Sequence, residues 1–137
     1  HRQLAIIGKE GNASVYTGAK CLEWAGSKTG RDWAVAGNLL AGPGVIDAMA
    51  RTFDDTNGTL AERMIASLKA GQKAGGDKRG RQSAALLVVR EGWGYAGLTD
   101  RFRDLRVDDH PQPIDELERI YRLHRKLFPR ADDLGRQ

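Results

Sequence analysis

The sequence has a single cysteine, Cys21, among its 137 residues. A lone cysteine cannot form an internal disulfide, and this cysteine usage is typical of a reducing compartment. The start of the sequence also lacks the features of a secretory signal peptide. Together these absences predict a cytoplasmic protein.

Long apolar runs are absent as well. The longest, Ala84 to Val89, has the length of a strand, whereas a membrane-spanning helix needs about 20 apolar residues. We therefore expect no membrane partner. Hydrophobic residues still make up 40% of the chain and charged residues 29%, which is enough for one globular domain with a buried core.

Charge of one sign forms no long block along the chain, and the tightest basic cluster is Lys73, Lys78, Arg79 and Arg81. Lysine and arginine number 22 against 18 acidic residues, a net charge of +4, and the two signs are interleaved. A nucleic-acid surface needs a stripe of one sign, so we expect no nucleic-acid partner. The three histidines, His1, His110 and His124, lie far apart and show no metal-ligand spacing, so the sequence predicts neither a metal site nor a cofactor.

Hydrophobic periodicity indicates both strands and helices. Residues 27–31 read as a turn, and the run from residue 83 to 90 reads as a strand buried on both faces. The predicted strands cover residues 4–8, 13–18, 32–40, 83–90 and 104–107.

Three helices are expected between and after these strands. One follows the Gly42–Gly44 break, and a second begins at a capping box formed by Thr59 and Glu62. The third begins at Pro113 and places His124 on its apolar face, as a core or seam histidine. The grouping of strands and helices predicts one α+β domain over residues 1–128, with residues 129–137 as a frayed tail.

Three groups of polar residues are candidates for chemistry. Asn38 follows a predicted strand, where its amide can donate to a developing oxyanion or can simply satisfy a bend. Arg81 and Gln82 lie in a basic loop before a strand, where they can clamp a substrate carboxylate or only cap the sheet edge.

The third group lies between the last strand and the last helix. Asp108 and Asp109 are adjacent carboxylates beside His110, and Arg106 precedes them. Such a group can do acid–base work, with helix capping and ion pairing as the alternative.

Several of these stretches carry a family resemblance. They are His1–Leu4, Thr17–Gly18, Trp24–Gly26, Gly37–Gly42, Leu60–Arg63, Gly75–Asp77, Arg79–Val89 and Leu105–Pro111. Together they resemble the family of unknown function numbered one thousand and twenty-eight, in the Ntn (N-terminal nucleophile) hydrolase superfamily. The likeness runs from His1 to about Phe128.

The resemblance implies an αββα layered sandwich and hydrolysis of an amide (C–N) bond of a small-molecule substrate. It also implies a nucleophile at the start of a preceding segment, where an α-amine with a pKa of about 8 activates the adjacent hydroxyl. His1 matches an internal family position, so we expect this chain to lack the nucleophile and to be an incomplete part of the sandwich.

In this interpretation Asn38, Asp108 and Asp109 are catalytic residues. Arg81, Gln82, Arg106 and His110 bind the substrate. The alternative is a non-catalytic ligand-binding or assembly module of the same fold.

An incomplete sandwich leaves an open sheet edge and an uncovered apolar face, and such surfaces recruit partners. We therefore expect the missing amino-terminal segment or a second copy of the chain as partner, and a homo-oligomer. The residues expected at this contact are Ile6, Ile7, Val15, Val35 and Leu87, with Ile114, Leu117 and Tyr121 as the alternative surface.

Overall fold

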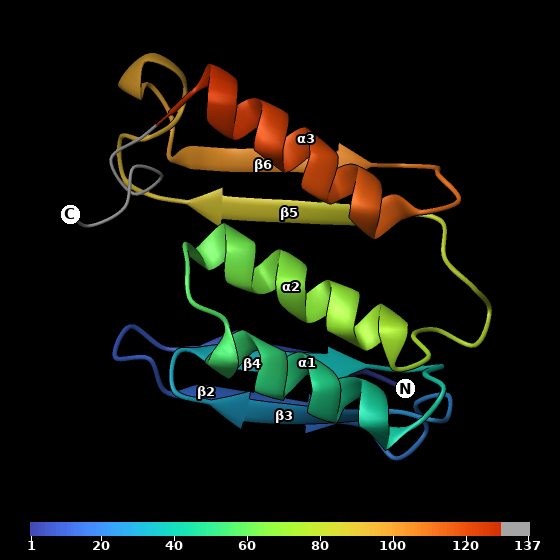
Figure 1. Cartoon of the computed structure of the whole chain (residues 1–137). Coiled ribbons are helices and arrows are strands. Elements are labelled where there is room, and N and C mark those ends of the chain that lie inside the picture. Colours follow the sequence, from blue (N-terminus) through green and yellow to red (C-terminus); the bar gives the residue numbers. More distant parts are fainter. Residues whose placement is uncertain (130–137) are drawn as a thin grey trace. The chain divides into compact units, whose positions relative to one another are not determined.

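The computed structural model describes residues 1–129 (Figure 1). Within this range the chain has three α-helices and six strands, and the strands form three antiparallel two-stranded sheets. The predicted α+β class is therefore confirmed. Apart from Pro129, the predicted frayed tail over residues 129–137 lies outside the described residues.

The chain divides into two compact units. Unit 1 comprises His1–Thr56 and Ala66–Gly80, and unit 2 comprises Asn57–Ile65 and Arg81–Gln137. The single domain expected over residues 1–128 stays a prediction. Within the described range, no helix is long and apolar enough to cross a membrane.

The first two predicted strands are confirmed, and they pair as a hairpin in unit 1. Strand β1 (Gln3–Ile7) pairs with β2 (Ala13–Thr17), with Gln3 opposite Thr17 and Ile7 opposite Ala13. Because side chains alternate between the two faces of a strand, Leu4 and Ile6 share one face of the hairpin and Gln3 and Ala5 share the other.

The second hairpin corrects the prediction of a turn over residues 27–31. Residues Gly26–Gly30 form strand β3, which pairs with β4 (Trp33–Gly37). The prediction failed because β3 is rich in glycine and small polar residues. A Cβ at Gly30 would lie 2.3 Å from the Trp33 ring, so glycine is needed there to let the ring lie against the strand.

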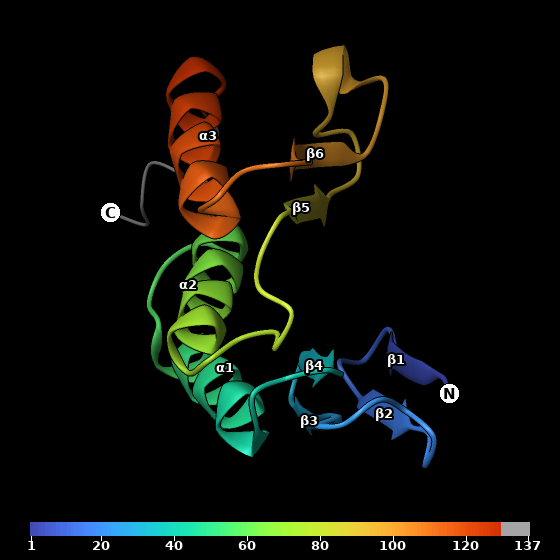
Figure 2. The same cartoon turned by 90° about the vertical axis from the view of Figure 1, so that its right-hand side faces the viewer.

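Unit 1 is layered in the order strands, strands, helix. Figure 2 shows the β1–β2 hairpin on one side of the β3–β4 hairpin and helix α1 (Pro43–Asp55) on the other. Helix α1 begins with Pro43, whose fixed φ suits the first turn. It buries Val45, Ile46 and Ala50, and its Phe53 ring lies 6.3 Å from the Trp33 ring.

Helix α2 (Leu60–Lys73) begins at the predicted capping box. The Thr59 backbone N–H donates to Glu62 Oε2 at 2.8 Å, and the Glu62 backbone N–H donates to Thr59 Oγ1 at 3.3 Å. These reciprocal bonds satisfy two of the backbone donors that a helix start leaves without partners.

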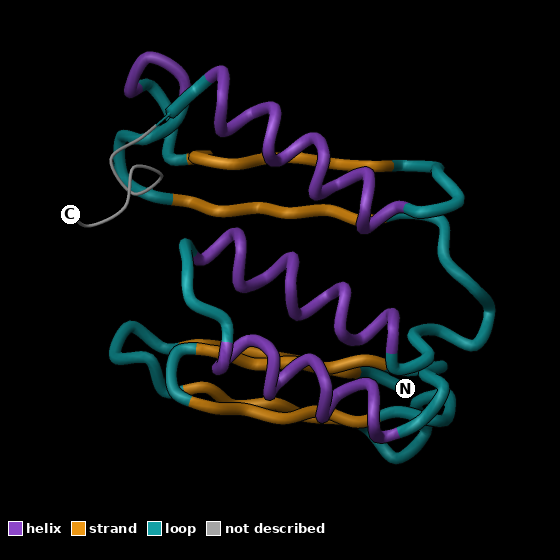
Figure 3. The backbone as a smooth tube through the Cα atoms, in the orientation of Figure 1, coloured by secondary structure: helices purple, strands orange, loops and turns teal. Residues whose placement is uncertain are grey.

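Unit 2 is built on a third hairpin and one helix. Strand β5 (Ala84–Val89) pairs with β6 (Arg101–Val107), and the loop between them contains the 3₁₀ turn η1 (Tyr95–Gly97) (Figure 3). Helix α3 (Pro113–Leu127) packs on both strands and starts at Pro113, as predicted. The core residues are Leu86, Leu105, Val107, Leu117 and Tyr121.

Two predictions for unit 2 are wrong. Strand β5 is not buried on both faces: Leu86 is 1% exposed, whereas Leu87 is 51% exposed. Helix α3 covers one face of the two-stranded sheet, and alternate side chains point away from it. The alternative contact surface on α3 is also excluded, because Leu117 and Tyr121 are fully used in the core.

Candidate functional site

The side chain of Asn38 belongs to a polar cluster in unit 1. Asn38 directly follows β4, and its Nδ2 donates to Gln3 Oε1 at 3.1 Å. Gln3 Nε2 in turn donates to Thr17 Oγ1 at 3.1 Å and to the carbonyl oxygen of Gly37 at 2.9 Å. The Thr17 hydroxyl also lies 3.0 Å from the Ser27 hydroxyl.

This cluster connects the two hairpins of unit 1, because Gln3 lies on β1 while Gly37 ends β4. The Gln3 amide is half-buried, so its several partners fix it in one orientation. Gln3 Oε1 accepts a hydrogen bond from the Asn38 amide and so holds that amide in one orientation. An amide nitrogen carries two N–H donors, and the bond to Gln3 uses one of them.

The backbone beside Asn38 is held in an unusual conformation. Leu39 has φ +55°, a left-handed value that costs a residue with a Cβ roughly 1 kcal/mol. Two backbone bonds hold it there: its N–H donates to the Leu22 oxygen at 3.0 Å, and its oxygen accepts from Lys78 N–H at 2.7 Å. Strain of this kind is often found at functional sites.

A second polar cluster lies in unit 2, where the structure brings Gln82, Asp109 and His110 together. Gln82 Nε2 donates to Asp109 Oδ1 at 3.2 Å, and the His110 backbone N–H donates to the Gln82 oxygen at 2.9 Å. The His110 ring accepts from the Gln112 backbone N–H at Nδ1, 3.0 Å away, so Nε2 is the nitrogen that carries the hydrogen of the neutral ring.

Arg106 and Asp108 form an exposed ion pair beside this cluster. Arg106 donates from one terminal nitrogen at 2.7 Å and from Nε at 3.3 Å to Asp108 Oδ1. The Asp108 carboxylate raises the pKa of Arg106 above its ordinary value. The Arg81 side chain is exposed and makes no hydrogen bond with any other described residue.

The predicted site residues therefore fall into two groups. Asn38 lies in unit 1, and the other six, Arg81, Gln82, Arg106, Asp108, Asp109 and His110, lie in unit 2. No group of three or more His, Cys, Asp or Glu side chains that could hold a metal ion occurs within residues 1–129.

The sequence analysis does not predict two buried or half-buried polar residues, Gln3 of β1 and Arg103 of β6. Gln3 was passed over because it begins an apolar strand, although a polar side chain on the inward face of a hairpin is itself a signal. Arg103 was missed because the last strand was expected to start at residue 104. Extending the alternation of Val107 and Leu105 by two residues places Arg103 on the buried face.

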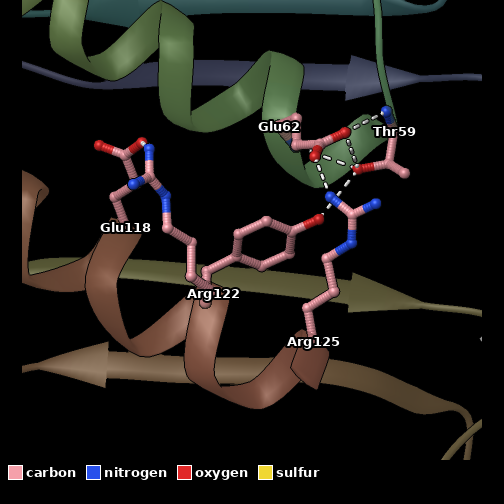
Figure 4. A network of polar contacts seen from close by, with 6 residues as sticks. Thr59, Glu62, Glu118, Arg122 and Arg125 are labelled. Carbon is pink, nitrogen blue, oxygen red and sulfur yellow. Dashed lines mark hydrogen bonds and ion pairs between the residues drawn. The ribbon is translucent and has the colours of Figure 1, made fainter. Parts of the chain in front are cut away.

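A third network in unit 2 connects α2 to α3 (Figure 4). The Thr59 hydroxyl lies 3.1 Å from the Tyr121 hydroxyl, and Arg125 donates to Glu62 Oε1 at 2.5 Å. The capping box of α2 is thus bonded to two side chains of α3.

A family model and a solved structure are similar to this chain. The model of a Family of unknown function (DUF1028) matches residues 1–117. The crystal structure of protein SPO2555 from Silicibacter pomeroyi, which carries the same family name, is similar with a TM-score of 0.79 and 33% identity. The match covers 91% of this chain and 51% of that one, so this chain spans about half the length of that relative. No curated protein matches. The chain belongs to the family of unknown function DUF1028.

Proposed function

We propose that the protein hydrolyses the amide (C–N) bond of a small-molecule substrate, as the Ntn hydrolases do. In this proposal the strand–strand–helix layering of unit 1 is part of an αββα sandwich. The nucleophile is a hydroxyl residue from chain outside these 137 residues. The relative from Silicibacter pomeroyi, about half of which this chain spans, has room for such a segment.

The observation that carries the proposal is the fixed amide of Asn38. Its orientation is set by Gln3, and the neighbouring Leu39 holds a strained backbone conformation between two hydrogen bonds. A donor that is already oriented before the reaction stabilises a developing oxyanion without reorganisation. Asn38 is exposed, so its second N–H can reach a substrate oxygen.

The predicted site residues of unit 2 form a group of their own, and their roles in substrate binding stay predictions. Within this group Asp109 orients Gln82, and Asp108 orients Arg106. Arg81, Arg106 and His110 are positive or polar groups of the kind that binds a carboxylate or carbonyl. The reaction needs no metal or cofactor: the amine-activated hydroxyl attacks the carbonyl carbon, and its proton passes through the α-amine to the substrate nitrogen, which leaves as an amine. Water then hydrolyses the acyl ester, which releases the acid and restores the hydroxyl.

The test is an assay of the complete gene product against a panel of small amides and imides, with release of ammonia or amine as the readout. The proposal predicts turnover of at least one class. Absence of release across the panel, with a protein shown to be folded by circular dichroism, would contradict it.

An assembly module is the second candidate, favoured by the apolar surface of β1. Leu4 is 65% exposed and Ile6 is 69% exposed, on the same face of the hairpin. We propose that a second copy of the chain covers this face, giving a homo-oligomer. Sedimentation equilibrium of the 137-residue chain tests it: a mass that rises with concentration supports self-association, and a constant mass of 15.0 kDa contradicts it.

A further inference from the structure

We propose that the guanidinium of Arg79 binds a carboxylate group of the substrate, so that the protein acts on small amides that also carry a carboxylate. This inference rests on the proposed hydrolase function and names its substrate class. Arg79 lies in unit 1, as Asn38 does, in a turn that follows helix α2. The Gly80 backbone N–H closes this turn by donating to the Asp77 oxygen at 3.1 Å.

Asp77 holds the Arg79 side chain in one orientation. Arg79 Nε donates to Asp77 Oδ1 at 3.0 Å, and one terminal nitrogen donates to Oδ2 at 2.7 Å. The Arg79 backbone N–H also donates to Oδ1, at 2.8 Å. These bonds to a single carboxylate leave the guanidinium little freedom, so it has little freedom to lose when it binds a ligand.

This bonding pattern leaves a second fork of the guanidinium available. A guanidinium has five N–H donors in one plane, and Asp77 accepts from two of them, on Nε and on the adjacent terminal nitrogen. The other donors lie on the two terminal nitrogens and make no hydrogen bond with any described residue. One N–H of each terminal nitrogen points away from Asp77, and such a parallel pair matches the two oxygens of a carboxylate. The Arg79 side chain is 70% exposed, so a ligand can reach this fork.

The backbone pairs this turn with the segment that contains Asn38. Leu40 and Asp77 form an antiparallel bridge. In this register the counterpart of Asn38, two residues before Leu40, is Arg79, two residues after Asp77. The backbone bond from Lys78 described above lies within the same pairing. The proposed oxyanion donor and the fixed guanidinium therefore lie on neighbouring segments of unit 1.

The charge of the turn favours an anion. Asp77 offsets the charge of Arg79, but Lys78 adds a second cation. The Lys78 ammonium donates to the backbone oxygen of Glu23 at 3.2 Å, and a carbonyl does not neutralise it. The turn therefore keeps a positive charge that attracts a carboxylate toward the open fork of Arg79.

Arg119 on α3 has a similar ion pair in a different setting. Its Nε and one terminal nitrogen donate to the two carboxylate oxygens of Glu116, at 2.8 and 2.6 Å. The residue directly before Arg119 is the acidic Glu118, whereas the residue directly before Arg79 is a lysine. The Arg119 pair is thus a matched control for charge and bonding without the surroundings that attract an anion.

The carboxylate at Arg79 and the carbonyl at Asn38 are two different groups of the substrate. The class that fits is an N-acyl amino acid or the half-amide of a dicarboxylic acid. A substrate of this kind places its scissile carbonyl by means of a distant anchor, and such anchoring contributes to the rate through orientation.

The binding test uses the sodium salts of N-acetylglycine, succinamate and glutaramate on the complete gene product, by isothermal titration calorimetry at constant ionic strength. N-acetylglycinamide, succinamide and glutaramide are their neutral analogues. We expect saturable binding of at least one acid, at least about tenfold tighter than that of its neutral analogue. Failure of all three acids to bind, or equal binding of acids and neutral analogues, would overturn the proposal.

Amine release from the same compounds separates this inference from the hydrolase proposal. Release from the neutral analogues at the same rate as from the acids would contradict the carboxylate site and leave the hydrolase in place. Binding of an acid that depends on Arg79, without any amine release, would support the carboxylate site and contradict the hydrolase.

Variants assign the binding to Arg79. Arg79→Gln should weaken binding of the acid about tenfold, and Arg79→Lys, which keeps the charge but loses the fork, about fivefold. Arg119→Gln removes an equal charge from a similar pair and should leave the affinity unchanged. Because Arg79 is exposed, its variants should fold, which circular dichroism checks. Unaltered affinity in Arg79→Gln, or an equal loss in Arg119→Gln, would overturn the assignment.

Discussion

The Tyr121 hydroxyl lies 3.1 Å from the Thr59 hydroxyl, although 62 residues separate them in the sequence. Tyr121 is buried on α3, and Thr59 is the capping residue at the start of α2. Thr59 therefore stabilises unit 2 in two ways. It caps the start of α2, and its hydroxyl contacts a buried side chain of α3.

Replacing Thr59 by alanine should destabilise the protein by about 1–2 kcal/mol. The change removes a helix cap, worth typically about 1 kcal/mol, and leaves the buried Tyr121 hydroxyl without this partner. Urea unfolding followed by circular dichroism measures the loss. Thr59→Ser keeps the hydroxyl and is the matched control, so equal stability of the alanine and serine variants would show that the hydroxyl has no such role.

Adjacent leucines of β5 should respond very differently to truncation. Leu86→Ala removes a fully buried side chain and should cost about 2–5 kcal/mol, whereas Leu87→Ala on the opposite face should change stability by less than about 0.5 kcal/mol. Thermal and urea unfolding of the two variants gives the comparison. A large loss for Leu87→Ala would mean that both faces of β5 are covered in solution.

Arg79 should hold the pKa of Asp77 below the ordinary value of an aspartate. The cause is the side-chain hydrogen bonds from Arg79 to both carboxylate oxygens, at 2.7 and 3.0 Å, aided by the Arg79 backbone N–H. A carboxyl with a lowered folded-state pKa stabilises the fold above its unfolded pKa of about 3.9, and this contribution is lost as the pH falls through the folded value.

An NMR titration of the Asp77 carboxyl carbon measures this shift. In Arg79→Gln the pKa of Asp77 should rise toward the ordinary value, while Arg51→Gln, which removes a charge from α1, should leave it low. The same low pKa in the Arg79 variant would show that the ion pair is not formed in solution.

The sequence predicts those elements whose signals are local. Pro113 and the Thr59–Glu62 capping box mark helix starts through backbone chemistry within one turn, and both starts are confirmed. Strand β3 could not be predicted in this way, because Thr29 is the one residue of Gly26–Gly30 that favours a strand. It forms because β4 pairs with it and because the Trp33 ring needs glycine beside it.

The arrangement of the candidate site residues also depends on contacts between segments that are distant in the sequence. The proximity of Gln82 and Asp109 follows from a loop and a strand end that lie 27 residues apart, and the prediction grouped these residues only through the family resemblance. Gln3 and Arg103 depend on how strands face their neighbours. Both residues lie directly before the expected strand starts at residues 4 and 104, so the alternation of inward and outward side chains was not extended to them.

The most direct test of the proposed hydrolase is the turnover number of Asn38→Ala in the complete gene product, measured by amine release from the best substrate of the amide panel. Loss of an oxyanion donor should lower kcat by about 100-fold or more with little change in KM. Asn12→Ala removes an exposed amide from the β1–β2 turn and should keep full activity. Equal kcat for the Asn38 and Asn12 variants would contradict the role of Asn38 and with it the account of the site.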